Sequence, residues 1–334
     1  MSGNSDSLIH SVAGAAGGII AMTVTYPLIF LSTRAAVETK NEQKVILVYL
    51  AISDIVEREG FLGLYKGLNS SLLGIAVTNG AYYYFYERTR ASILRARVRG
   101  KGLSTVESML AGLIAGSATS IISNPIWVVQ TQQAVHGMHD ASSASQRPAK
   151  RSMVETVEHI LRKDGIGAFW RGIGPALVLV INPVLQYTVF EQLKNILIKR
   201  RTAVLRAAGQ TAAVAILTDW DFFFLGALSK LVATSVTYPY IVVKSRLQAG
   251  QGEALKYKSA IDGLLTIVRN EGVRGLYKGV GSKLLQSVLT AAILFAGQRR
   301  IYEITKKVRR CFSYAMQIGP CYMLSQAVTP VLSK

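Results

Sequence analysis

Residues 59–67 read Glu-Gly-Phe-Leu-Gly-Leu-Tyr-Lys-Gly, and this pattern decides the fold because it occurs three times in the chain. It consists of an acidic residue and a glycine, four variable residues, and then an aromatic residue, a basic residue and a glycine. The other copies run from Asp164 to Gly172 and from Glu271 to Gly279, so the closing glycines lie 105 and 107 positions apart. A pattern that recurs at one period indicates three structural repeats.

A proline in an apolar stretch precedes each copy of the pattern. These prolines are Pro27, Pro125 and Pro239. We expect each repeat to contain two membrane helices joined by a segment with a short helix. The prolines are expected to kink the first helix of each repeat, because neighbouring helices in a membrane bundle satisfy the carbonyls that a proline leaves free.

Long stretches without Asp, Glu, Lys or Arg locate the membrane helices. They run over 7–33, 67–86, 108–139 and 172–190, and each approaches or exceeds the roughly 20 residues that a membrane helix needs. Two shorter stretches, 231–243 and 284–298, complete a set of six. The sequence therefore predicts an all-α membrane protein with six transmembrane helices in three pseudo-threefold repeats. The repeats are expected at 8–97, 103–198 and 218–308, with a C-terminal extension at 309–334.

The charge of the chain lies in its connections. The 334 residues include 38 basic and 19 acidic ones, a net charge of +19. Basic clusters at 88–101, 194–206 and 299–310 follow the three even-numbered spans, which places them on the cytosolic side, beside lipid phosphates. We expect no nucleic-acid partner, because no reader motif accompanies the charge. No catalytic, cofactor or metal motif is present either, so an enzyme is not expected.

This architecture resembles the mitochondrial carrier superfamily (solute carrier family 25) of six-helix solute transporters, over residues 8–308. After each proline, that family carries an acidic and then a basic residue, which form an ionic gate on the matrix-type side. At the acidic positions of the motif, this chain has Ile29, Trp127 and Ile241. At the basic positions of the second and third repeats it has Gln130 and Lys244. The resemblance therefore implies that this gate is closed by apolar or polar contacts, with Gln130 and Lys244 at the gate positions.

The even-numbered helices of the family end in a second gate motif, on the cytosolic side. Two copies match, and they assign Glu87 with Arg90 and Glu191 with Lys194 as gate residues. The third copy has Gln298-Arg299 at the equivalent offset and Tyr302-Glu303-Ile304-Thr305-Lys306 one turn later, so only two of the three links of this gate are expected to be intact.

Three strings are similar to the peroxisomal adenine nucleotide carriers within this superfamily: residues 124–127, 182–187 and 283–292. The resemblance implies a monomeric carrier in the peroxisomal membrane that exchanges ATP for AMP or ADP by alternating access. The mitochondrial inner membrane is the alternative location. Other possibilities are a carrier of a larger adenine-containing cofactor (CoA, NAD or FAD) and a non-transporting membrane scaffold.

Broken symmetry between the repeats indicates the binding site. Nine residues before the prolines stand Gly18, Gly116 and Lys230, so only the third repeat has a charge there. The third repeat also has Lys283 and Gln286 where the other two have Ser71 and Ala176, and Gly74 and Leu179. A charge at membrane depth usually faces a wet cavity or a partner, and lysines suit phosphate groups as point charges. Alternatively, these lysines extend to the membrane interface or form bonds between helices.

Amide and aromatic side chains are candidates for the base or ribose. Asn79 and Tyr83 lie in the second span and Asn182 in the fourth. Alternatively, the tyrosines are anchors at the membrane interface, and Asn182 bonds the carbonyls that Pro183 frees.

Overall fold

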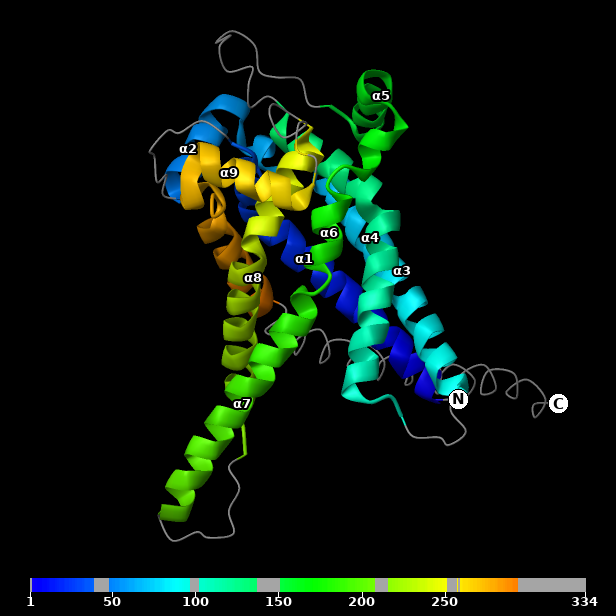
Figure 1. Ribbon diagram of the computed structural model, residues 1–334, viewed down its shortest axis with the longest axis vertical. Coiled ribbons are helices and arrows are strands. Elements are labelled where there is room, and N and C mark those ends of the chain that lie inside the picture. Colours follow the sequence, from blue (N-terminus) through cyan, green and yellow to red (C-terminus); the bar gives the residue numbers. More distant parts are fainter. Residues whose placement is uncertain are drawn as a thin grey trace, which may run out of the picture. The chain divides into compact units, whose positions relative to one another are not determined.

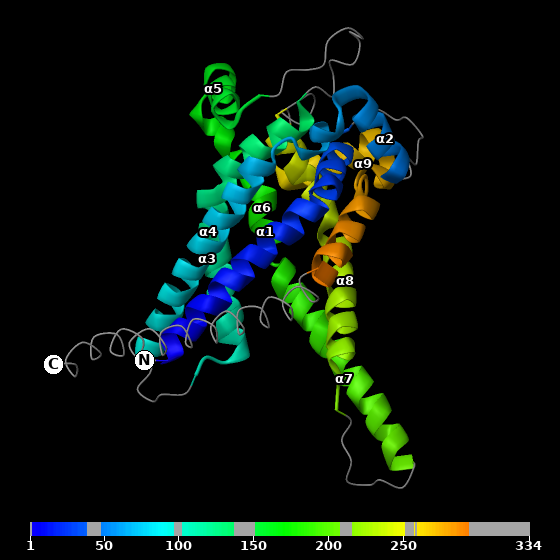
Figure 2. The ribbon, with the colours of Figure 1, turned by 180° about the vertical axis from the view of Figure 1, so that it is seen from behind.

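The computed structural model describes residues 2–38, 48–96, 102–136, 151–207, 216–250, 257 and 259–293 (Figures 1 and 2). Its helices are α1 (Ser2–Val37), α2 (Val48–Glu59), α3 (Leu68–Arg95), α4 (Thr105–Val135), α5 (Met153–Asp164), α6 (Ile173–Leu179), α7 (Asn182–Ala207), α8 (Asp219–Ala249) and α9 (Ala260–Gly275). A further helix runs over Val280–Ile293. Short 3₁₀ helices lie at Phe61–Tyr65 and Ile166–Trp170. The described part contains no strand, and the order of long and short helices confirms the all-α, three-repeat membrane fold. The predicted extension at 309–334, the third basic cluster and the third gate copy lie outside the described residues.

Four of the described segments are long and apolar enough to cross a membrane: Gly18–Val37, Thr105–Val135, Ile166–Ala207 and Trp220–Ala249. They are the first, third, fourth and fifth predicted spans. The second span corresponds to α3, which has 28 residues but carries polar residues along its length. The sixth begins with Val280–Ile293, whose continuation is outside the described residues. Thr25–Val288 form one compact unit, and the contacts analysed below lie within it.

The fourth span differs from the single helix expected over 172–190. It is divided into α6 and α7 by a turn at Val180 and Ile181. Pro183 explains the division, because a proline lacks the N–H of the helical hydrogen bond and its ring clashes with the carbonyl four residues earlier. The three prolines that were expected to kink a helix lie inside helices that continue past them: Pro27, Pro125 and Pro239.

The residue before each of these prolines ties the helix to the loop pattern of its own repeat. The hydroxyl of Tyr26 donates to the carbonyl oxygen of Lys66 at 2.7 Å, and that of Tyr238 donates to Lys278 at 2.9 Å. In the second repeat the amide of Asn124 replaces the tyrosine and donates to the carbonyl of Arg171 at 3.1 Å. One hydrogen bond is thus made three times with two kinds of side chain.

The glycines that close the pattern join each repeat to the next. Gly67, Gly172 and Gly279 have φ values of 85°, 76° and 79°, which favour glycine. A Cβ atom on them would lie 3.2 Å from the carbonyl oxygen of Gln130, 3.1 Å from that of Lys244 and 2.8 Å from that of Ser32, respectively. These carbonyls all stand five residues after a proline, so the contacts run from repeat 1 to 2, from 2 to 3 and from 3 to 1.

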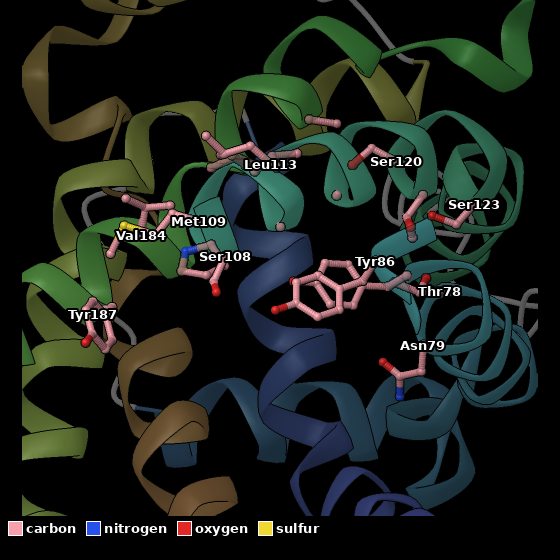
Figure 3. Close-up of a pocket in the computed structure, with 18 of the residues that line it drawn as sticks. Thr78, Asn79, Tyr86, Ser108, Met109, Leu113, Ser120, Ser123, Val184 and Tyr187 are labelled. Atoms are coloured by element: carbon pink, nitrogen blue, oxygen red, sulfur yellow. The ribbon is translucent and has the colours of Figure 1, made fainter. Parts of the chain in front are cut away.

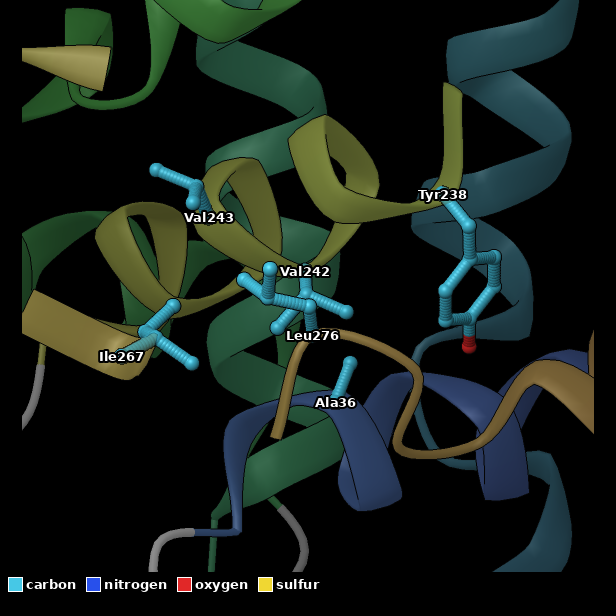
Figure 4. Packing of buried hydrophobic residues seen from close by; sticks show 6 residues of the cluster. All are labelled: Ala36, Tyr238, Val242, Val243, Ile267 and Leu276. Atoms are coloured by element: carbon cyan, nitrogen blue, oxygen red, sulfur yellow. The ribbon is translucent and has the colours of Figure 1, made fainter. Parts of the chain in front are cut away.

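Apolar side chains close the same end of the unit. Val37, Val135 and Ala249, each ten residues after a proline, form a buried cluster at the ends of α1, α4 and α8. A second cluster lies around Val242 and Val243 of α8, against Ile267 of α9 and Ala36 of α1 (Figure 4). The first helices of the three repeats are therefore in contact at their C-terminal ends.

Replacing Gly279 tests this closure. Gly279→Ala should lower the melting temperature of the detergent-purified protein, because the left-handed backbone costs a non-glycine residue roughly 1–2 kcal/mol and the new Cβ would press on Ser32. The matched control is Gly80→Ala in α3, where a Cβ meets nothing within 4 Å. This exposed helical position should gain roughly 0.5–1 kcal/mol from alanine. Equal melting temperatures for the two variants would contradict the described contact.

Candidate functional site

A cavity of about 900 Å³ lies between α3, α4, α6 and α7. From α3 it receives Thr78, Asn79, Tyr82 and Tyr86, and from α4 a row of small polar residues that includes Ser108, Ser120 and Ser123 (Figure 3). Val184 and Tyr187 of α7 line another side. Its size lies within the range of small-molecule sites, which combine apolar walls with a few polar groups.

Trp127 stands at one of the acidic positions of the family motif and lines this cavity. Its indole Nε1–H donates to the hydroxyl of Thr78 at 3.3 Å, which joins α4 to α3. Thr119, also in the lining, has a buried hydroxyl without a hydrogen-bond partner among the described residues. The wall therefore combines a fixed aromatic surface with a polar group that is available to a ligand or water.

Asn182 is held by the neighbouring helix. Its Nδ2 donates to the hydroxyl of Thr237 in α8 at 2.7 Å. This Nδ2 group therefore does not donate to the backbone carbonyls that Pro183 leaves without a helical hydrogen bond. The carbonyl oxygen Oδ1 is buried and has no partner among the residues that the structure places, so Asn182 retains a fixed acceptor next to Pro183, a residue of the cavity wall.

Three lysines of the third repeat are only partly exposed. Lys230, Lys244 and Lys283 are each half-buried. No ion pair joins any of them to an acid within the described ranges. Gln286 lies one turn after Lys283 on the same helix. Of the three lysines, Lys244 lines the cavity between α3, α4, α6 and α7.

The residues expected to close the cytosolic side pair within their own helices. Arg90 and Glu87 of α3 are joined at 3.1 Å, and Lys194 and Glu191 of α7 at 2.5 Å. Each pair is three residues apart on one helix and links no two helices. These side chains thus leave α3 and α7 unconnected in the conformation described.

At the opposite end, the acidic residues of the repeated pattern are the anchors of buried ion pairs. Glu59 binds Arg34 at 2.6 Å and Lys66 at 2.7 Å, and Glu271 binds Arg246 and Lys278. Burial raises the pKa of each glutamate, but the hydrogen bonds from its two cations outweigh this and hold the pKa below its ordinary value. The pairs therefore stabilise the fold above the ordinary carboxyl pKa, and this contribution is lost as the pH falls through the lowered pKa.

The two arginines also connect the repeats. Arg34 Nε donates to the carbonyl of Ala134 in α4 at 2.7 Å, and Arg246 Nε donates to that of Ala36 in α1 at 2.9 Å. The second repeat has Gln132 at the equivalent position. Its acid, Asp164, pairs with Arg171 at 2.7 Å, and that hydrogen bond lowers the pKa of the carboxyl group.

The joint between α4 and α8 consists of neutral groups. Thr131 Oγ1 donates to Gln248 Oε1 at 3.3 Å, and Gln248 Nε2 donates to Asn124 Oδ1 at 3.1 Å. Two charged joints and one neutral joint therefore connect the first helices of the repeats.

The family model described as mitochondrial carrier protein matches residues 3–97, 101–201 and 217–310. This chain belongs to the mitochondrial carrier family. The three matched segments cover most of the carrier, and membrane transport is the role that this membership supports.

Relatives of this carrier are found in plants, animals and fungi. A peroxisomal nicotinamide adenine dinucleotide carrier of Arabidopsis thaliana is 37% identical over 318 residues, which cover 87% of this chain and 94% of the relative. Peroxisomal membrane protein PMP34 of Mus musculus is 32% identical, with 90% and 94% covered. Peroxisomal adenine nucleotide transporter 1 of Saccharomyces cerevisiae is 30% identical, with 91% and 93% covered. These findings confirm the expected location: the carrier is a multi-pass protein of the peroxisomal membrane.

The structure groups the candidate residues of this carrier in a way that sequence reasoning did not foresee. Asn79 lines the cavity, whereas Tyr83 is 70% exposed and does not line it, which fits the anchor alternative. Lys230, Lys283, Gln286 and Asn182 also lie outside the cavity wall. Gln130 is buried, with its carbonyl against Gly67. Trp127 and Asn124 were missed as wall residues, although both break the symmetry of the repeats, opposite isoleucine and tyrosine respectively.

The buried ion pairs lead to a stability prediction for this carrier. Glu271→Gln should lower the free energy of unfolding by about 3 kcal/mol or more, because it leaves the buried Arg246 without its acid. The control is Glu158→Gln, whose partner Arg162 has a side chain that is 79% exposed. Such an exposed pair contributes about 1 kcal/mol or less. Thermal unfolding in detergent measures both, and a Glu271→Gln protein as stable as the control would contradict the assignment.

Proposed function

We propose that this carrier moves adenine nucleotides across the peroxisomal membrane by alternating access, with ATP exchanged for AMP or ADP. The observation that carries the proposal is a cavity with aromatic and amide walls that includes a half-buried lysine, Lys244. No acid pairs with Lys244 or with Lys283 in the part of the chain that the structure describes. An adenine ring can stack on aromatic side chains and form hydrogen bonds with amide groups, and a phosphate chain can bind lysine side chains. A nucleotide would therefore interact with both the cavity wall and the lysines.

The base would lie against the aromatic wall. Trp127 is fixed by its hydrogen bond to Thr78, and Tyr82 and Tyr86 stack on each other with ring centroids 6.0 Å apart. The amide of Asn79 lies on the same helix as the tyrosines and provides a donor and an acceptor. The unpaired Oδ1 of Asn182 is a second acceptor for an exocyclic amine.

The phosphates would bind Lys230 and Lys283, with Gln286 as a neutral neighbour. Lysine ammonium groups bind phosphate as point charges without a fixed fork geometry. Repulsion between neighbouring lysines disfavours the empty site, and a bound polyanion relieves it. This supports an anionic solute over a neutral or cationic one.

Alternating access would open the two ends in turn. At the end of α1, α4 and α8, closure consists of apolar contacts, glycine contacts and the hydrogen bonds from Arg34 and Arg246 to neighbouring repeats, since the ionic gate of the family motif lacks its acids. On the cytosolic side, Glu87, Arg90, Glu191 and Lys194 would exchange their partners within a helix for partners on neighbouring helices. The first helices would move about Pro27, Pro125 and Pro239.

A second candidate solute is NAD, because the plant relative with 37% identity is named as a carrier of that dinucleotide. ATP and NAD share an adenosine with at least two phosphates, which is the chemistry of the proposed site. CoA and FAD contain the same adenosine diphosphate unit and are tested alongside. A scaffold without transport activity predicts no saturable uptake at all.

Transport into liposomes tests the proposal. Purified protein is reconstituted, vesicles are preloaded with AMP, NAD, CoA or FAD or left empty, and uptake of labelled ATP is measured. Uptake that depends on internal AMP is expected. Uptake only into vesicles loaded with NAD, CoA or FAD would favour the larger cofactors, and no uptake into any vesicle would contradict nucleotide transport.

A lysine substitution connects the proposal to the site. Lys283→Ala should abolish ATP uptake, because it removes a central cation of the proposed phosphate site, while the amount of protein in the vesicles stays unchanged. Lys199→Ala removes an equal charge from an exposed position of α7 and should transport normally. Normal uptake by Lys283→Ala would exclude Lys283 from the site.

A further inference from the structure

One end of the cavity lies at the joint between the second and third repeats. Asn124 of α4 and Lys244 of α8 both line the cavity there. Asn124 Oδ1 accepts a hydrogen bond from Gln248, which is one turn after Lys244 on α8. A Cβ atom on Gly172 would lie 3.1 Å from the carbonyl oxygen of Lys244, and Ala176, one turn after this glycine, also lines the cavity. Lys244, Asn124 and Ala176 therefore form one end of the cavity together.

This joint differs from its two equivalents in the cation that it presents to the cavity. The residue four positions after each closing glycine and the residue five positions after the proline of the next repeat form three pairs: Ser71 with Gln130, Ala176 with Lys244, and Lys283 with Ser32. Both members of the second pair line the cavity, and no member of the other two pairs does. The methyl side chain of Ala176 leaves room for Lys244, so the lysine contributes to the cavity wall.

Hydroxyl groups of α4 line the same end of the cavity. Thr119, Ser120 and Ser123 stand within five residues of Asn124, and Figure 3 labels the two serines on the α4 ribbon. Thr119 and Ser123 are four positions apart on one helix face, and each is 3% exposed. The buried Oγ1 of Thr119 has no hydrogen-bond partner among the described residues. This end of the cavity thus combines a cation with hydroxyl donors.

The chemistry of this end favours an anion. None of the described residues that line the cavity is acidic, and Lys244 forms no ion pair within the described ranges. An unpaired, half-buried cation and an unpaired, buried hydroxyl both cost free energy. An oxyanion would satisfy both groups, because its charge balances the ammonium group and its oxygens accept hydrogen bonds from the hydroxyls.

An aromatic surface lies close to the same end. Trp127 is four positions after Ser123, about 6 Å along the axis of α4. Its indole donates to Thr78, and a Cβ atom on Gly74 would lie 3.3 Å from the ring, so the indole packs directly on α3. A nucleoside that lies against this indole would bring the phosphate attached to its ribose to the hydroxyls of α4.

We propose that Lys244, Thr119 and Ser123 form a subsite for one phosphate group of the solute, the group attached to the ribose. The assignment rests on the proposed nucleotide transport and deepens it, because AMP, ADP, ATP and NAD all carry this group. Lys244, which stands at a gate position of the family motif, is then a substrate-binding residue. The subsite distinguishes a nucleotide from the nucleoside that lacks the phosphate.

Binding of AMP and of adenosine to the purified carrier in detergent, measured by calorimetry, tests the subsite. Lys244→Gln should weaken the binding of AMP by about tenfold and leave that of adenosine unchanged, because hydrogen bonds to a charged group are lost only with AMP. Lys244→Arg keeps the charge and should keep most of the affinity for AMP. Thr119→Val removes the unpaired hydroxyl but keeps the shape of the side chain, and it should weaken AMP binding by about fivefold without an effect on adenosine.

Two controls change similar groups outside the cavity. Ser117→Ala removes a hydroxyl of α4 that donates to the carbonyl oxygen of Leu113 at 2.8 Å. Lys199→Gln removes an exposed charge from α7. Both variants should bind AMP as the wild type does.

Unchanged AMP binding in Lys244→Gln would overturn the subsite, and so would an equal loss of AMP and adenosine binding. If Lys244→Gln fails to fold, judged by its melting temperature, Thr119→Val decides by the same comparison. If adenosine binds too weakly to be measured, Lys244→Arg decides, because a phosphate subsite requires that arginine restore the affinity that glutamine removes. Wild-type protein that neither binds nor transports adenine nucleotides overturns the proposed function as well. Transport by the wild type together with unaffected variants overturns the subsite alone.

Discussion

The fold depends on the register at which the first helices of the three repeats end against one another. Gly67, Gly172 and Gly279 have a left-handed backbone and lie against carbonyl oxygens five residues after a proline of the next repeat. Only glycine combines that backbone with so close an approach. The apolar cluster of Val37, Val135 and Ala249 occupies one set of equivalent positions because this register places it there. The hydrogen bonds from Tyr26, Asn124 and Tyr238 hold each loop in position for the contact.

The charged residues of the carrier lie in two different environments. The acids of the repeated pattern, Glu59, Asp164 and Glu271, are all paired, so the cations around them stabilise the closed end. The lysines of α8 and of the helix at 280–293 have no such acid among the residues described. Among the described residues, the chain therefore supplies counter-charges to the cations of the closed end and not to these lysines.

The architecture of this carrier could be predicted because it depends on local sequence patterns. Repeated glycines and prolines, charge-free stretches and the missing acids at 29, 127 and 241 are all visible in it. The division of the fourth span at Val180 depends on competition between helix continuation and Pro183, which the length of the stretch does not reveal. The placement of Lys244 and Trp127 in one cavity wall depends on how α4 and α8 pack, and Tyr83 leaves the site because of the rotation of α3. Such rotations are set by tertiary contacts.

The neutral joint between α4 and α8 limits how the repeats can be rearranged. Arg34 and Arg246 each extend from one repeat to a carbonyl of another, whereas Gln132 stands in their place in the second repeat and Gln248 forms the contact instead. A circular permutation that only moves the termini keeps every neighbour and preserves all three joints. A shuffled gene that exchanges the second and third repeats, or one that duplicates the second repeat, would bring surfaces together that have not been matched to each other. The three repeats have thus become specialised for their neighbours, and their order along the chain is part of the structure.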